Sequence, residues 1–186
     1  MKRVISFVLV LVMLIGMLPV VVTDANATAS AVKTNLELVE RAKNVVDNYK
    51  TLYVMGGWGA PLTESNKQRF IDGHTYNQSS SRKAMINAAT SDTFAFDCVC
   101  LIKALLWGWD GDLSAKNGGA IYNSNGVPDK GTEEMIALCK DVSTDFSDIE
   151  VGELLWMSGH VGLYIGNGLA IECTPEWKNG VQICNG

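Results

Sequence analysis

The sequence predicts an α+β domain, with helices in its first part and an antiparallel sheet in its last part. Residues 34–49, 97–109 and 132–142 have helical periodicity or helix-start signals. After residue 151 the pattern changes to short apolar runs separated by Gly, Asn and Pro, which is typical of strands joined by tight turns. Helices followed by antiparallel strands indicate the α+β class. The 186 residues, 47% of them hydrophobic, suit one globular domain.

The first 27 residues are predicted to form a secretory signal peptide. A short positive segment precedes an apolar run over 4–22, and residues 25–27 and 27–29 both fit an Ala-x-Ala cleavage site. The run is close to the roughly 20 residues of a membrane span, so an uncleaved anchor is the alternative. Pro19 and the tandem cleavage sites favour cleavage. We therefore expect a secreted protein with no stable membrane association after cleavage.

The charge of the chain argues against two classes of partner. Removing Lys2, Arg3 and Asp24 with the leader takes 15 basic and 20 acidic residues to 13 and 19, a formal charge of −6. The chain also has no basic run. We therefore expect no binding to nucleic acid or to an anionic membrane surface.

The segment between the leader and the cysteine pair is predicted to be mixed. Residues 28–35 are small and polar, as in a linker, and the domain is expected to span 36–186. A capping box marks the first helix, and "LYVM" then leads as a strand into "GGWGAP", a turn where backbone comes close to another group. Residues 62–92 are polar and are predicted to be mostly loop with one short helix.

Two cysteines, Cys98 and Cys100, begin the apolar helix over 97–109. With Asp97 as the cap, a helical wheel places Cys100 about 200° from Cys98 and nearer to Lys103. Lys103, the one charged residue of the run, is expected to mark the solvent-facing side. The two thiols then share no face, so they can neither pair nor bind one metal ion, and a zinc site that uses both is disfavoured.

Cys98 has the sequence features of a nucleophilic thiol. Five cysteines are an odd number for a secreted chain, which indicates at least one free thiol, although a disulfide between Cys173 and Cys184 is possible. In the first turn of a helix, free backbone N–H groups and the positive helix end favour thiolate over thiol.

A base and an orienting carboxylate are predicted on the C-terminal hairpin. Only two histidines are present, His74 in a polar loop and His160 at the start of a strand. If residues 166–168 form a three-residue loop, Gly162 lies opposite Glu172, and His160 and Glu172 are diagonal neighbours on one face. A two-residue loop would put Glu172 on the other face. The expected catalytic triad is Cys98, His160 and Glu172.

Three stretches together resemble a known family. "YVMGGWG", "DCVCLIK" and "GELLWMSGHVGLYIGNGLAIE" are similar to the NlpC group of papain-like cysteine peptidases, which cut bacterial peptidoglycan, and more loosely to the CHAP amidases. The resemblance covers about residues 36–183 and implies a papain-like fold, with the nucleophile-bearing helix packed on the sheet. Five residues match family positions, for the nucleophile, the acid before it, the base, the third polar residue and an oxyanion-holding tyrosine: Cys98, Asp97, His160, Glu172 and Tyr53.

The chain departs from the family in three ways. Val99-Cys100 stands where the family has Ser-Gly, so Cys100→Gly is expected to leave activity largely intact. The third residue of the family is more often His, Asn or Gln than Glu. The family would also have another strand or two after "VQICNG", so the domain is either C-terminally truncated or has a trimmed sheet.

The resemblance implies a monomeric, secreted cysteine hydrolase of the cell wall that cleaves the stem peptide of bacterial peptidoglycan. No metal ion or cofactor is expected. Trp58, Asp97 and Trp177 are the candidates for substrate contact. Two alternatives stay open: a catalytically silent cell-wall binding domain on the same fold, and a muramoyl amidase or acyltransferase.

Overall fold

The computed structural model describes residues 2–5 and 31–185. It confirms the α+β class. The helices and strands, in chain order, are β1 (Lys2–Ile5), α1 (Asn35–Asn48), β2 (Lys50–Tyr53), β3 (Trp58–Pro61), α2 (Glu64–Gly73), the 3₁₀ helix η1 (Thr75–Gln78), α3 (Ser80–Ala88), β4 (Thr93–Phe96), α4 (Cys98–Leu106), α5 (Thr132–Ala137), β5 (Asp141–Ser143), β6 (Leu154–Met157), β7 (His160–Gly166), β8 (Leu169–Thr174) and β9 (Gly180–Asn185).

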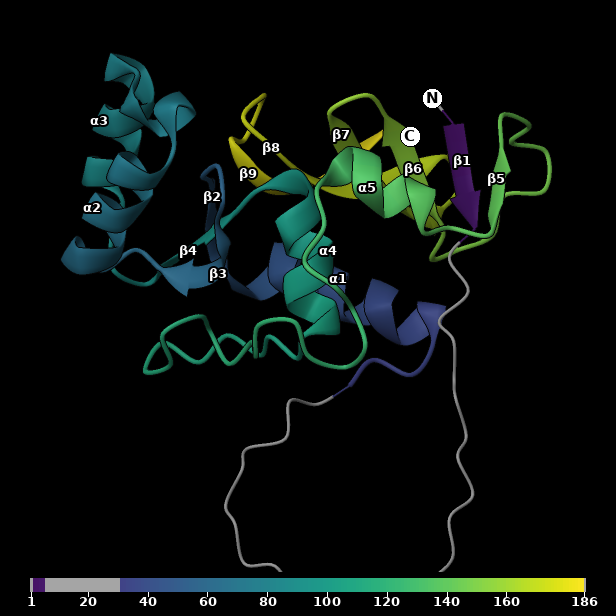
Figure 1. Ribbon diagram of the computed structural model, residues 1–186, viewed down its shortest axis with the longest axis horizontal. Helices are drawn as coiled ribbons and strands as arrows, with labels where there is room; N and C mark the ends of the chain where they lie inside the picture. Colours follow the sequence, from purple (N-terminus) through teal and green to yellow (C-terminus); the bar gives the residue numbers. More distant parts are fainter. Residues whose placement is uncertain (1, 6–30, 186) are drawn as a thin grey trace, which may run out of the picture.

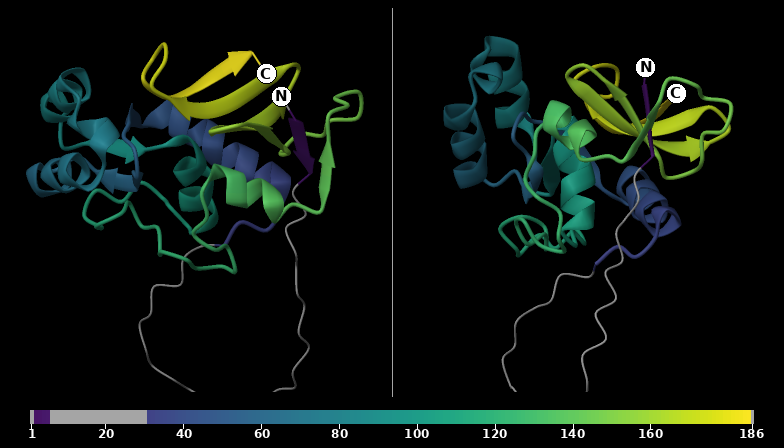
Figure 2. Two further views of the ribbon diagram at one scale, coloured as in Figure 1. Left: turned by 45° about the horizontal axis from the view of Figure 1, so that its top comes forward. Right: turned by 45° about the vertical axis from the view of Figure 1, so that its right-hand side comes forward.

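The strands form two sheets that meet near the start of α4. The larger sheet is antiparallel, in the order β5-β1-β6-β7-β8-β9, and α1 and α4 pack against it (Figures 1 and 2). The smaller sheet has the order β2-β4-β3. The sheets are joined because Thr51 Oγ1 accepts a hydrogen bond from Val181 N (2.9 Å) and Tyr53 N donates to Asn179 O (2.9 Å).

Most of the predicted leader lies outside the described residues. Its residues 2–5 form β1, which pairs with β5 on one side and with β6 on the other. Residues 6–27, and with them most of the apolar run, are not among the described residues, so the signal peptide stays a prediction. Within residues 2–5 and 31–185, no helix is long and apolar enough to cross a membrane.

The polar segment over 62–92 contains more helix than the sequence indicates. Two helices, α2 and α3, flank η1, and strand β4 follows them directly before Asp97. The segment folds around a fully buried side chain, that of Asn77. Its amide donates to Met55 O (3.0 Å) and Phe70 O (2.9 Å), and its carbonyl accepts from Met55 N (3.1 Å). These three bonds tie the helices to the glycine turn after β2.

The prediction that Lys103 marks a solvent-facing side of α4 is wrong. The Lys103 side chain is only 3% exposed, and its ammonium forms an ion pair with Asp129 and donates to Lys130 O (2.9 Å). Cys100 is buried as well. The long loop before α5 therefore covers the side of α4 that the wheel assigns to solvent, and α4 is buried on all sides.

The C-terminal part matches the expected series of short strands, with one difference. The helix predicted over 132–142 ends at Ala137, and residues 141–143 form β5 instead. Gly131 rather than Thr132 is the N-cap, and Glu134 accepts from the Gly131 N–H (3.2 Å). α5 is therefore a short helix that lies at the surface (Figure 1).

Candidate active site

The start of α4 is fixed by Asp97. One Asp97 oxygen accepts from Cys100 N (2.7 Å) as the helix cap, and the other accepts from Gly56 N (2.9 Å) in the glycine turn. Burial raises the pKa of Asp97, and these two N–H groups oppose that rise. Because both oxygens of this buried carboxylate bind backbone, its contacts favour a role in holding Cys98 in place over the predicted contact with substrate.

The glycine turn after β2 lies close to two other groups, as the sequence predicts. Gly56 has φ +77°, and a Cβ at this residue would lie 2.1 Å from His74 Nε2. A Cβ on Gly57 would lie 2.8 Å from the backbone carbon of Ala95. The exposed His74 ring therefore packs on the turn that receives Asp97, which the sequence did not indicate.

The β7–β8 hairpin places His160 and Glu172 on one face of the sheet, but its loop differs from the predicted one. The loop is a two-residue Asn167-Gly168 turn with positive φ at both residues (55° and 72°), so the predicted three-residue loop is wrong. A bulge between Tyr164 and Gly166 places one extra residue on β7. This bulge restores the predicted register, because Leu163 pairs with Ile171.

The side chains of His160 and Glu172 are in contact, as expected from the pairing of β7 with β8. A Cβ on Gly162 would lie 3.7 Å from Glu172 Cβ, so Gly162 sits opposite Glu172 and leaves room beside it. The His160 Nε2 and Glu172 Oε2 atoms are 2.6 Å apart. The predicted pairing of these two residues on one face of the hairpin is confirmed.

The His160 ring joins Glu172 to Cys98. Interaction with the nearby Cys98 side chain, and then the hydrogen bond with Glu172, raise the pKa of His160 from 6.5 to about 9, against the effect of burial. The hydrogen bond to His160 in turn lowers the pKa of Glu172. Near neutral pH the ring is therefore a cation that is paired with the Glu172 carboxylate and lies near Cys98.

Tyr53 lies at the end of β2, next to the nucleophile. It pairs with Phe96 of β4, two residues before Cys98, and its ring packs edge-on against Tyr76 at 5.9 Å. Burial, followed by the charge of Cys98, raises the pKa of Tyr53 well above its ordinary value. The phenol therefore stays protonated and can act as a hydrogen-bond donor.

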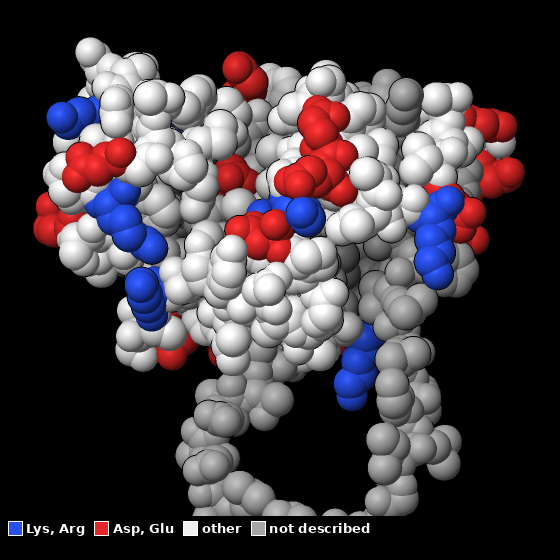
Figure 3. Space-filling model, in the orientation of Figure 1, with Lys and Arg blue, Asp and Glu red and all other residues white. Residues whose placement is uncertain are grey.

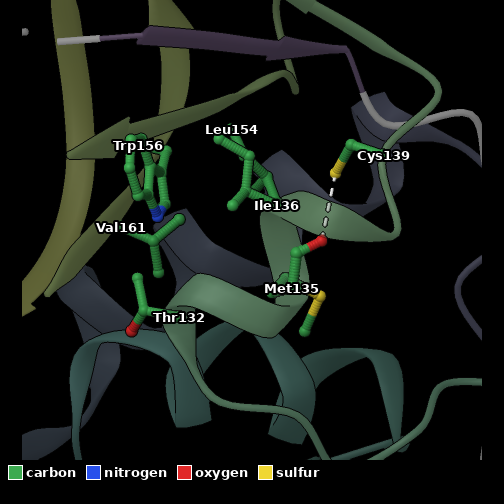
Figure 4. Close-up of a pocket in the computed structure, with 7 residues that line it drawn as sticks. All are labelled: Thr132, Met135, Ile136, Cys139, Leu154, Trp156 and Val161. Atoms are coloured by element: carbon green, nitrogen blue, oxygen red, sulfur yellow. Dashed lines mark hydrogen bonds between the residues drawn. The ribbon is translucent and has the colours of Figure 1, made fainter. Parts of the chain in front are cut away.

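Two residues that the sequence did not single out for the site lie against the sulfur. Cys98 is 6% exposed, and its Sγ lies 3.9 Å from Thr132 Oγ1 in α5 and 3.9 Å from Gly159 O in the turn before β7. Beside Thr132 a narrow pocket separates α5 from the sheet (Figure 4), lined by Thr132, Met135, Ile136, Cys139, Leu154, Trp156 and Val161.

The two tryptophans proposed for substrate contact lie in different surroundings. Trp58 packs edge-on against Trp107 at 5.5 Å and lies 5.7 Å from Tyr122. Trp177 lies between β8 and β9 and is 78% exposed. The structure thus places Trp58 in an aromatic cluster and leaves Trp177 open to solvent.

The remaining cysteines do not form the disulfide that the sequence allows. Cys173 and Cys184 are both free. Cys184 pairs with Ala170, whereas Cys173 pairs with Val181, so their side chains lie on opposite faces of the sheet. In the described ranges, 2–5 and 31–185, no group of three or more His, Cys, Asp and Glu residues could hold a metal ion.

The arrangement suits nucleophilic attack by Cys98. A thiol at a helix start, next to an imidazole that a carboxylate orients, has the parts that covalent catalysis by cysteine requires. Comparison of the chain with protein-family models, with curated proteins and with solved structures finds no match. The function proposed below therefore follows from the site and from the motifs that surround it.

Glu172→Gln is expected to lower the pKa of His160 from about 9 toward its ordinary 6.5, because the anion that stabilises the imidazolium is removed. An NMR titration of the histidine ring protons measures this directly. The chain has only two histidines, so His74→Ala identifies the resonance. Glu176→Gln, at an exposed acid in the β8–β9 connection, is the control. An unchanged His160 pKa in Glu172→Gln would contradict the pairing.

Proposed function

We propose that the chain is a secreted, papain-like cysteine hydrolase that cleaves amide bonds in the stem peptide of bacterial peptidoglycan. The observation that carries the proposal is the pairing of His160 with Glu172 at 2.6 Å, with Cys98 near enough to the imidazole to raise its pKa. The packing of α1 and α4 on one antiparallel sheet supports the papain-like assignment. The substrate class rests on the resemblance of the three motifs that surround these residues.

The mechanism begins with the transfer of the Cys98 thiol proton to His160. The sulfur attacks the amide carbonyl, and the Cys98 N–H and the Tyr53 hydroxyl hold the developing oxyanion. His160 then donates its proton to the leaving amine, which departs. Water, activated by the neutral imidazole, attacks the thioester and releases the acid and the free thiol.

The complete triad favours an enzyme over the silent cell-wall binding domain. A binding domain needs no carboxylate 2.6 Å from a histidine, and it needs no thiol beside that histidine. Hydrolysis at the muramoyl amide and acyl transfer use the same residues, so these two reactions differ from the proposed one only in the bond or the acceptor. All three place the enzyme at the cell wall, outside the cytoplasm.

Digestion of purified peptidoglycan tests the proposal and separates these reactions. Mass spectrometry of the products identifies each new amine and carboxylate, and with them the bond that is cut. We expect cleavage within the stem peptide by the wild-type chain and none by Cys98→Ala. Release of intact stem peptides would assign the amidase reaction instead. Equal, background-level digestion by both proteins would refute the hydrolase.

Tyr53→Phe is expected to lower kcat by about a hundredfold with little change in KM, because one oxyanion donor is lost. The ring and its packing on Tyr76 remain, so folding should be preserved. Tyr76→Phe is the matched control, since it changes the neighbouring, more exposed phenol. The measurement is steady-state hydrolysis of a soluble muropeptide. A wild-type kcat in Tyr53→Phe would show that the Tyr53 hydroxyl does not stabilise the oxyanion.

A further inference from the structure

The candidate nucleophile is covered from two sides. α5 brings Thr132 Oγ1 to 3.9 Å from the Cys98 sulfur, and the β6–β7 turn brings Gly159 O to the same distance. Cys98 is 6% exposed as a result. For the attack, a carbonyl carbon must approach the sulfur to roughly 3–3.5 Å. A substrate therefore cannot reach the thiol unless one of these two segments moves.

Glu133 joins the two covering segments to each other. Its carboxylate accepts a hydrogen bond from Gly159 N (2.8 Å) and another from Ser158 Oγ (3.2 Å). Glu133, Ser158 and Gly159 are all exposed, so the bonds can open into water without burying a charge. This contact directly links α5 to the turn that precedes His160.

The rest of α5 is held less firmly than the other helices around the site. None of its residues is buried, and its underside rests on Leu154, Trp156 and Val161 across the narrow pocket (Figure 4). Only half-buried apolar side chains, those of Met135 and Ile136, attach α5 to the core.

The chain before α5 is anchored, in contrast to α5 itself. The buried ammonium of Lys103 binds the Asp129 carboxylate and the Lys130 carbonyl. Residues 129 and 130 are therefore a fixed point from which α5 can swing. Acidic side chains also gather at the surface over α5 (Figure 3), where Glu134 forms an ion pair with Lys130 (3.0 Å).

We propose that α5 is a lid over Cys98, that Glu133 latches it to the β6–β7 turn, and that the lid swings about residues 129–130 to admit substrate. The proposal rests on the proposed function only in taking Cys98 as the reacting group. Glu133 is a positioning residue in this scheme, because it acts through the segments that it holds together.

Alkylation of Cys98 by iodoacetamide tests the lid without any substrate. The rate of modification, followed by mass spectrometry of the Cys98 peptide, is expected to rise about fivefold or more in Glu133→Ala, since two hydrogen bonds to a carboxylate are lost. Glu134→Gln is the matched control, because Glu134 lies on the same helix but binds Lys130 and Gly131 rather than the turn. We expect its rate to equal that of the wild type.

Cys184 on β9, which is half-buried, provides an internal reference in the same digest. Faster labelling of Cys98 with an unchanged rate at Cys184 supports the lid. An unchanged or slower rate at Cys98 in Glu133→Ala overturns it. Equal acceleration at Cys98 and Cys184 overturns it too, because the substitution would then have loosened the whole fold rather than α5. If the protein failed to digest peptidoglycan, the proposed hydrolase activity would be refuted, but the alkylation rates would still test the lid because they require no substrate.

Discussion

Cys98→Ala is expected to abolish hydrolysis, with a loss on the order of a million-fold in kcat, as for other nucleophiles that act within a triad. Cys100→Ala is expected to stay within a few-fold of the wild type. Burial raises the pKa of the Cys100 thiol well above its ordinary value, so Cys100 remains a neutral thiol in the core. Release of amines from peptidoglycan, measured for both variants at equal folded concentration, checks the difference.

The buried position of Cys100 changes which substitution is the better control. The sequence alone favours Cys100→Gly, because the resembling family has glycine at this position. Glycine inside a helix costs about 1 kcal/mol relative to alanine, and α4 is part of the core. Alanine therefore separates loss of the sulfur from loss of the helix. Full activity in Cys98→Ala with none in Cys100→Ala would mean that the other sulfur is the nucleophile.

His160→Ala is expected to lower kcat by at least about a thousandfold and to slow the alkylation of Cys98, because the cation beside the sulfur is lost. His74→Ala is the matched control. The His74 ring packs on Gly56 and is exposed, so we expect its removal to change activity only a few-fold. Labelling of Cys98 that is equally fast in both variants would be incompatible with the proposed pair.

The pH dependence of the wild-type enzyme follows from the same pair. The pKa of His160 is raised from 6.5 to about 9, so the imidazolium persists through neutral pH and is lost as pH rises through about 9. The alkaline decline of kcat/KM should therefore centre near 9. The raised pKa of His160 also stabilises the folded chain. This contribution is present at pH 6.5, where the Glu172 carboxylate is ionised, and it disappears as pH rises through about 9.

Local signals in the sequence were enough to predict the helix that begins at Cys98 and the pairing of His160 with Glu172. Asp97 and the apolar run behind it predicted a helix that begins at Cys98, and strand alternation predicted His160 and Glu172 on one face. The loop between the strands was predicted incorrectly. A three-residue loop leaves residues 166–168 unpaired, whereas the observed two-residue turn leaves 167–168 unpaired and adds a bulge before Gly166. Both arrangements pair Leu163 with Ile171, so the sequence does not distinguish them.

The features that the sequence missed depend on contacts between distant segments. Burial of Lys103 requires the loop that carries Asp129, and no local pattern indicates that this loop folds back over α4. The helices between residues 62 and 92 are organised by Asn77, a polar residue that resembles any loop asparagine until its partners are known. The cover over Cys98 likewise comes from Thr132 and Gly159, which follow it far along the chain.

The hairpin of β7 and β8 also determines when the His160–Glu172 pair forms during synthesis. A growing chain exposes Cys98 and the whole of α4 before the ribosome has added His160 or Glu172. Antiparallel pairing of β7 with β8 brings the carboxylate to the imidazole, so the His160–Glu172 pair forms only after Glu172 has been added. Every shorter nascent chain lacks this pair. Under the proposed function, the order of the residues thus delays activity until the C-terminal hairpin has folded.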